Sequence, residues 1–260
     1  MNGLKKIQAL FHNQKANIAY LTAGDGGATT TVQAALALIE GGVNLLEIGV
    51  PFSDPIADGP VIQQASARAL QNGTHLKQVL EIVRTIRSKS AVPMILFSYY
   101  NPILAALSPT FFQELVEAGV DGLLIVDCPL EESEDLEQEC LEHELAFIPV
   151  ITPSTPMDRV ALMTARAHGF LYYACRKGTT GMKSNLPDDF PKKMTSLKST
   201  TSVPIVVGFG ISDRATAAQV LEKADGVVIG SLFVKALADG MGFQELTSLA
   251  KSIYSVCAKK

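Results

Sequence analysis

The stretch PIVVGFGISDRATAAQVLEKADGVVIG occupies residues 204–230 and contains one strand–loop–helix–strand unit. Its two strand candidates, Pro204–Val207 and Gly226–Ile229, are short, continuously apolar and rich in β-branched residues. Between them, Ala215–Lys223 has helical periodicity. Strands that are apolar without alternation are typical of a parallel sheet that is covered on both faces. The stretch therefore predicts a β-loop-α module followed by the strand of the next module.

The same pattern recurs along the whole chain. Further helical patterns occupy Ala34–Glu40, Leu76–Arg87 and Phe111–Glu117. The other strand candidates are Asn17–Thr22, Val43–Gly49, Pro93–Ser98, Gly122–Val126, Ala146–Ile151 and Phe170–Ala174. Eight modules in about 250 residues predict an α/β fold, a (β/α)8 TIM barrel with its active site at the C-terminal face of the strands. We expect residues 1–260 to form this barrel as a single domain.

A doubly wound open sheet is the main alternative fold. It would be expected to carry a dinucleotide-binding fingerprint, but Gly208-Phe209-Gly210 has no third glycine at the required offset. The barrel is therefore favoured.

Composition and charge narrow the class of function. The 260 residues include 22 Lys and Arg against 26 Asp and Glu, a formal net charge of −4, and 47% are apolar. Without a basic excess, nucleic acid and anionic membranes are poor candidate partners. No apolar run approaches the roughly 20 residues of a membrane span, and no secretory signal core is visible. Four cysteines without CxxC spacing fit a reducing cytoplasm, and four scattered histidines indicate no metal site. We expect a cytoplasmic protein that acts on a small molecule.

The spacing of the strand candidates indicates where the chain has extra length. The starts at 43 and 93 are 50 residues apart and those at 170 and 204 are 34 apart, whereas all other neighbours are less than 30 apart. Because the loops that follow the strands form the active-site face of a barrel, we expect covering loops after the second and sixth strands.

Glu47 interrupts an otherwise apolar strand candidate near its C-terminal end. Burial of a carboxylate is costly unless it is paired, solvated or protonated. Burial also raises its pKa and suits it to general acid or base catalysis near neutrality. A satisfied polar residue inside the barrel is the alternative interpretation, but acids at strand ends usually lie at the active face.

Asp54 and Asp58 follow in a stretch rich in proline and glycine. Turn and capping chemistry explains aspartates in such a stretch. A stiff loop could equally hold a second carboxylate opposite Glu47, and the sequence pattern alone leaves both interpretations open.

Glycines follow the last two strand candidates. Gly210 lies in the run GFGIS after the seventh strand, and Gly230-Ser231 follows the eighth, just before a helical stretch. Barrels often bind phosphate with these two loops and a helix N-terminus, where glycines let backbone N–H groups approach the anion. The alternative is that the glycines only end the strands.

The second long segment reads CRKGTTGMKS at residues 175–184. A nucleotide P-loop needs four residues between its glycines and a glycine directly before lysine, so this segment does not match one. We expect a flexible lid with Gly178 and Gly181 as hinges.

Residues 46–60, LEIGVPFSDPIADGP, resemble the signature segment of the tryptophan synthase α subunit family. DCPLEE at 127–132, GFGIS at 208–212 and Gly230-Ser231 follow in the family's order, so the resemblance covers essentially the whole chain. It implies a (β/α)8 lyase that cleaves indole-3-glycerol phosphate to indole and glyceraldehyde 3-phosphate by a retro-aldol reaction. It also implies an αββα heterotetramer in which the β subunit takes the indole and carries pyridoxal phosphate, with no cofactor and no metal in this chain.

The resemblance implies roles for individual residues as well. Glu47 matches the general acid/base, Asp58 the second catalytic carboxylate and Tyr172 an active-site tyrosine. Asp54 and Pro55 match a contact with the β subunit. The implied substrate-binding residues are Tyr20 and Phe97 at the indole ring, Thr180 on the lid, where it meets Asp58, and Gly181, Gly210, Gly230 and Ser231 at the phosphate.

The lid departs from the family pattern Ser-Arg-x-Gly-Val-Thr-Gly, because Cys175 and Thr179 replace the serine and the valine. Cys128 also replaces a common aliphatic residue near the β-subunit contact. These changes keep open an alternative function, a weakly catalytic α subunit that acts mainly as an allosteric activator of the β subunit. The intact Glu47 and Asp58 favour a working lyase, and the segment at 46–60 disfavours other phosphate-binding barrels.

Overall fold

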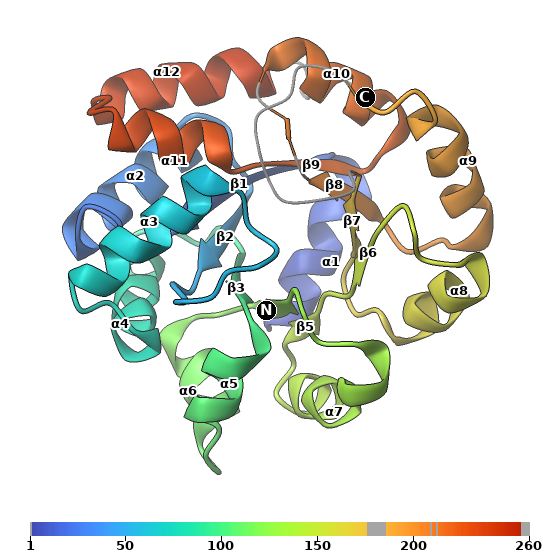
Figure 1. The fold of residues 1–260 in the computed structure, drawn as a ribbon, viewed down its shortest axis with the longest axis horizontal. Helices are drawn as coiled ribbons and strands as arrows, with labels where there is room; N and C mark the ends of the chain where they lie inside the picture. Colours follow the sequence, from blue (N-terminus) through green and yellow to red (C-terminus); the bar gives the residue numbers. More distant parts are fainter. Residues whose placement is uncertain (1, 176–185, 209, 212, 256–260) are drawn as a thin grey trace.

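Parallel strands form a central sheet that helices surround in the computed structural model (Figure 1). The structure describes residues 2–175, 186–208, 210–211 and 213–255. The strands are β1 (Ala16–Thr22), β2 (Leu45–Gly49), β3 (Met94–Ser98), β4 (Gly122–Ile125), β5 (Ala146–Phe147), β6 (Val150–Ile151), β7 (Leu171–Ala174), β8 (Ile205–Gly208) and β9 (Gly226–Ile229).

The helices account for most of the remaining described residues. They are α1 (Gly3–Asn13), α2 (Ala28–Glu40), α3 (Pro60–Gln71), α4 (Leu76–Arg87), α5 (Tyr100–Ala106), α6 (Phe111–Ala118), α7 (Glu134–Glu142), α8 (Met157–Arg166), α9 (Phe190–Thr200), α10 (Arg214–Lys223), α11 (Ser231–Ala238) and α12 (Phe243–Tyr254), with a short 3-10 helix at Leu130–Glu132. None of these described helices is long and apolar enough to cross a membrane.

One segment, residues 146–151, closes the sheet into a barrel. The strand order is β5-β4-β3-β2-β1-β9-β8-β7-β6, so β5 and β6 lie at the two ends of the order although they are neighbours in the chain. The Ile148 N–H donates to Leu123 O at 2.9 Å on one side, and the Tyr172 N–H donates to Pro149 O at 3.0 Å on the other. The predicted TIM barrel is therefore confirmed. The predicted single strand Ala146–Ile151 is divided in two, and Pro149, which has no N–H to donate, lies at the division.

The alternating side chains of the strands build two apolar layers. Side chains such as Ile18, Leu45 and Ile95 fill the inside of the barrel, whereas Leu21 and Leu46 pack between the sheet and the helices. Because both faces are buried, the strands are apolar at nearly every position, which is why they could be predicted.

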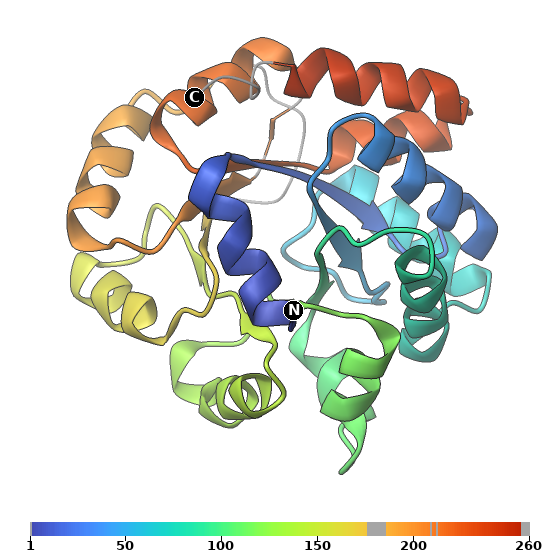
Figure 2. The same cartoon turned by 180° about the vertical axis from the view of Figure 1, so that it is seen from behind.

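Helix α1 closes the N-terminal end of the barrel and was not predicted. Figure 2 shows it lying across this end. Its Leu4 N–H donates to Glu144 O at 2.8 Å, and its Ile7 is fully buried. A side chain at Gly122 or Gly169 would come within 3.1 Å of Ile7, so glycines at the starts of strands make room for the helix. Helix α1 does not cover the opposite end of the barrel, where the strands finish, so a functional site can form there.

The long interval after β2 differs from the expected covering loop. It consists of a ten-residue loop, 50–59, and an additional helix, α3, that begins at Pro60 before the predicted helix α4. Proline suits the first position of a helix, and α3 buries only one face, through Ile62, Ala65 and Ala69. The expected lid after β7 lies almost wholly in residues 176–185, outside the described residues.

Candidate active site

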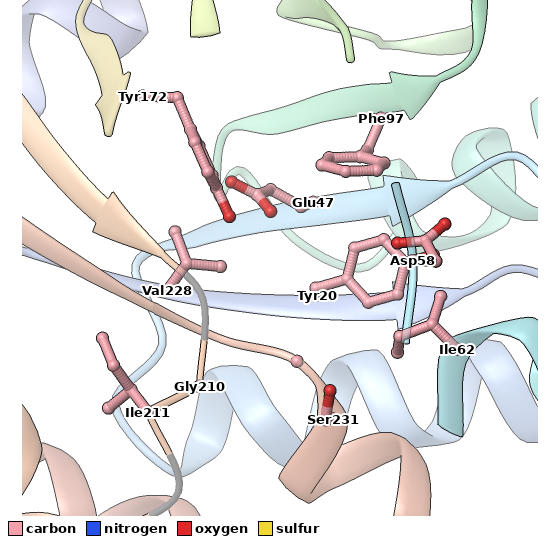
Figure 3. Close-up of a pocket in the computed structure, with 11 residues that line it drawn as sticks. Tyr20, Glu47, Asp58, Ile62, Phe97, Tyr172, Gly210, Ile211, Val228 and Ser231 are labelled. Carbon is pink, nitrogen blue, oxygen red and sulfur yellow. The ribbon is translucent and has the colours of Figure 1, made fainter. Parts of the chain in front are cut away.

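A cavity opens at the C-terminal end of the barrel strands (Figure 3). Its empty space, counted together with the open mouth, is about 490 Å³. The lining residues are Tyr20, Glu47, Asp58, Ile62, Phe97, Tyr172, Gly210, Ile211, Val228, Gly230 and Ser231. All the predicted catalytic and substrate-binding residues that the structure describes therefore meet in one place.

Glu47 lies on β2 opposite Tyr20 of β1 and points into this cavity. Its side chain is 1% exposed, and neither carboxyl oxygen has a hydrogen-bond partner among the described residues. Removal from water disfavours the charged form, so burial raises the pKa of Glu47 to about 8. A carboxyl group of this kind is largely protonated at neutral pH and can both give and take a proton near that pH.

Asp58 comes from the loop 50–59 rather than from a strand. Its N–H donates to Pro55 O at 3.0 Å, so the backbone does make the turn that such a stretch suggests, while its buried side chain lines the cavity. Burial raises the pKa of Asp58 to about 6, against the opposing effect of a 2.9 Å hydrogen bond that Tyr99 donates to Oδ2. Asp58 therefore ionises at a lower pH than Glu47.

Aromatic side chains line the cavity beside the carboxyl groups. Tyr20 and Phe97 pack edge to face with ring centroids 5.2 Å apart. The Tyr172 hydroxyl points toward Glu47 (Figure 3), and burial together with the Glu47 charge raises the pKa of Tyr172 well above its usual value. Its hydroxyl is therefore protonated at neutral pH and is a hydrogen-bond donor.

Glycines and a helix start line the other part of the cavity. Gly230 follows β9 directly and precedes α11, whose first residue, Ser231, faces the cavity. Gly210 follows β8 with a φ of 77°, a conformation that favours glycine. The first N–H groups of a helix have no partner within it, so they can bind an anion at this position.

Of the remaining predicted residues, some are described away from the cavity lining and the others lie outside the described residues. Asp54 and Pro55 lie in the outer turn of the loop 50–59, next to Ile56, which is 76% exposed. Thr179, Thr180 and Gly181 are outside the described residues. Cys175 is buried at the end of β7, where its N–H donates to Gly208 O at 3.3 Å.

The apolar lining residues Ile62, Ile211 and Val228 were not predicted from the sequence, and neither were two residues that support the lining, Tyr99 and Gly49. Tyr99 donates a hydrogen bond to the Asp58 carboxyl group. Gly49 leaves room for the Tyr20 hydroxyl, because a Cβ at position 49 would stand 2.1 Å from Tyr20 Oη. The position of Tyr99 just beyond a strand end was the available signal for its role. Nothing in the local pattern distinguishes Gly49 from a glycine that only ends a strand.

Comparison with known proteins decides the family to which this arrangement belongs. The family model described as "Tryptophan synthase alpha chain" matches residues 7–258. The chain belongs to the tryptophan synthase alpha chain family. Enzymes of this family are lyases that cleave indole-3-glycerol phosphate, so the predicted family and enzyme class are confirmed.

Individual relatives agree over nearly the full length. The tryptophan synthase alpha chain of Coxiella burnetii is 51% identical over 250 residues, covering 96% of this chain and 97% of the relative. That of Chlamydia caviae is 47% identical over 254 residues, covering 96% and 98%. The crystal structure of the alpha subunit from Legionella pneumophila superposes with a TM-score of 0.86 at 34% identity, covering 98% of each chain. A Mycobacterium tuberculosis tryptophan synthase structure gives 0.88 at 32% identity, covering 99% and 97%.

Proposed function

We propose that this chain cleaves indole-3-glycerol phosphate with Glu47 as the general acid and base and Asp58 as the anion that binds the indole N–H. The observation that carries the proposal is one cavity that joins a glycine-lined helix start at Gly230-Ser231 to the buried Glu47, whose carboxyl group has no hydrogen-bond partner among the described residues. Carboxyl chemistry and anion binding are thus available to the two ends of one substrate.

The reaction needs two proton transfers, one to the substrate and one from it, so that no proton is gained or lost overall. Indole C3 takes up a proton, the bond between C3 and the side-chain carbon breaks, and the hydroxyl on that carbon loses its proton as the aldehyde forms. Protonated Glu47 supplies the first proton, and its carboxylate then accepts the second. A pKa of about 8 suits this role, because the acid form dominates at pH 7 while the base form is not far in energy.

Asp58 has a different role because its pKa is about 6. At pH 7 it is mainly ionised, so it can accept a hydrogen bond from the indole N–H and stabilise positive charge that develops on the ring. Two carboxyl groups held at different proton affinities divide acid and anion functions between them.

The other lining residues position the substrate. Tyr20 and Phe97 pack against the faces and edge of the indole ring, and the protonated hydroxyl of Tyr172 donates a hydrogen bond beside Glu47. Gly210, Gly230 and Ser231 bind the phosphate, with the N-terminal dipole of α11 favouring its charge. Thr180 and Gly181 complete the site from the lid in this proposal.

An alpha chain of this family has a β-chain partner, and we propose that the partner docks on the rim beside the cavity to form an αββα heterotetramer. The turn at Asp54 and Pro55 presents the exposed Ile56, and α5 and its end present the exposed Leu104 and Leu107. A groove lined by residues from both elements joins this loop to α5. The partner, not this chain, carries pyridoxal phosphate.

The thiols of Cys128 and Cys140 support a reducing, cytoplasmic location.

The test measures indole released from indole-3-glycerol phosphate by the purified chain, with and without the β chain. We expect release by the chain alone and faster release in the complex. No release in either case, together with normal activation of the β chain, would instead support the activator alternative. In that case Thr179→Val is expected to raise turnover if the lid departures are the cause.

A further inference from the structure

Tyr99 contacts the Asp58 segment at two neighbouring atoms. Its side chain is buried, and its hydroxyl donates to Asp58 Oδ2 at 2.9 Å. The Tyr99 hydroxyl oxygen also accepts a hydrogen bond from the Ala57 N–H at 3.1 Å. Because the incoming Ala57 N–H occupies an acceptor position, the hydroxyl proton is directed to the carboxyl group.

The ring of Tyr99 and the backbone beside it each make a contact that holds the residue in place. It packs against Phe52, at the start of the same loop, with centroids 5.2 Å apart. Its backbone lies between β3 and α5, and the next residue, Tyr100, donates its N–H to Asp127 Oδ1 at 2.7 Å. The hydroxyl therefore approaches Asp58 from the junction of β3 and α5, whereas Asp58 belongs to the loop 50–59.

We infer that Tyr99 is a positioning residue that fixes the Asp58 carboxyl group in the cavity and, by donating a hydrogen bond to it, favours its charged form. Within the described part of the chain, no other donor bonds this carboxyl group. The inference rests on the proposed role of Asp58 and adds the residue on which that role depends.

The direction of the effect follows from which form of Asp58 the bond favours. A donor stabilises the carboxylate, so the Tyr99 bond lowers the pKa of Asp58 while burial raises it. Removing the hydroxyl leaves burial unopposed, so a larger fraction of Asp58 is protonated between pH 6 and pH 7.

The other titratable residues that line the cavity with Asp58 have pKa values raised above this range. Tyr20 and Tyr172 sense the Asp58 charge, but burial raises the pKa of each well above its usual value. Glu47 lines the same cavity with a pKa of about 8. The charge of Asp127, which follows β4, contributes to raising the pKa of Tyr99. A titration near pH 6 that disappears in Asp58→Asn can therefore be assigned to Asp58.

The test compares the wild type with Tyr99→Phe, which keeps the ring and removes only the hydroxyl. Tyr173→Phe is the matched control, because it removes a hydroxyl from β7 on the face that packs against the helices. Two readouts are used: the pH dependence of kcat/KM for indole release in the complex with the β chain, and the ¹³C carboxyl titration of Asp58 in the full chain.

In Tyr99→Phe we expect the Asp58 titration and the acid limb of kcat/KM to move to higher pH. For a rise of one pKa unit we also expect kcat/KM at pH 6 to fall roughly fivefold and to recover almost fully by pH 8, since the ionised fraction of Asp58 at pH 6 drops from about one half to about one eleventh. A loss of activity at all pH values with an unmoved Asp58 titration would overturn the inference, as would unchanged profiles. If the wild type releases no indole, the proposed function fails, while the ¹³C comparison still decides the effect of Tyr99 on Asp58.

Discussion

The hydroxyl of Tyr20 lies over Gly49, in the space that a side chain at position 49 would need. A Cβ added to Gly49 would stand 2.1 Å from Tyr20 Oη. Tyr20 faces Glu47 in the β1–β2 register, so its side chain leans two residues along β2, toward the mouth of the barrel. Tyr172 leans over Gly208 of β8 in the same way, at 1.9 Å. Each tyrosine of the cavity therefore depends on a glycine in a neighbouring strand.

Gly49→Ala is expected to displace Tyr20, to destabilise the chain by about 1–3 kcal/mol and to lower kcat/KM for indole release. Tyr20→Leu shortens the clashing side chain while it keeps an apolar group in place. The unfolding free energies of the two single variants and the double variant form a cycle. We expect the double variant to lose less stability than the sum of the singles, and strict additivity would show that the two positions do not interact.

Glu47 makes stability depend on pH. Its folded-state pKa of about 8 lies above the ordinary value of 4.5, so the folded chain binds more protons than the unfolded chain between these values. The contribution of Glu47 to the free energy of unfolding is therefore greatest below pH 4.5 and is lost progressively as the pH rises toward 8.

Glu47→Gln cannot ionise, so its unfolding free energy relative to the wild type is expected to rise by a few kcal/mol between pH 5 and pH 8. Denaturant unfolding at a series of pH values measures this difference. The same substitution at the exposed Glu81 on α4 is the control. A difference between Glu47→Gln and the wild type that stays constant with pH would mean that Glu47 ionises normally in the folded chain.

Ser231→Asp places a negative charge at the start of α11, where the proposed phosphate site lies. Repulsion of the substrate phosphate is expected to raise KM at least tenfold, a cost of about 1.4 kcal/mol, with a smaller effect on kcat. Steady-state kinetics of indole release checks this. The control is Ser248→Asp on the exposed face of α12, and equal KM values for the two variants would remove Ser231 from the phosphate site.

Most of the barrel could be predicted because parallel strands buried on both faces leave a continuous apolar signal. The strand at Gly226–Ile229 agrees at both ends, and most of the others agree to within a residue or two. Helix α1 was not predicted from the sequence. Its role depends on Ile7 reaching glycines more than a hundred residues away. The segment Ala146–Ile151 is divided at Pro149, because the part before it pairs with β4 and the part after it pairs with β7. That change of partner depends on the whole barrel and not on the local sequence.

The site also contains residues that could be predicted from the sequence and residues that could not. Glu47 could be predicted because a carboxylate in an apolar strand is unusual in itself. Asp58 remained ambiguous because turn chemistry explains an aspartate equally well, and the structure shows that it makes the turn and lines the cavity. Tyr99 and Gly49 act through contacts between strands and loops, which no local pattern records.

The most direct test of the account is indole release by Glu47→Gln, assayed with the β chain present at pH 7. We expect kcat/KM to fall by about 10²–10⁴-fold, the range of general acid–base catalysis, while the variant remains folded and still activates the β chain. Release within tenfold of the wild type would contradict the account, because the two proton transfers would then not pass through Glu47.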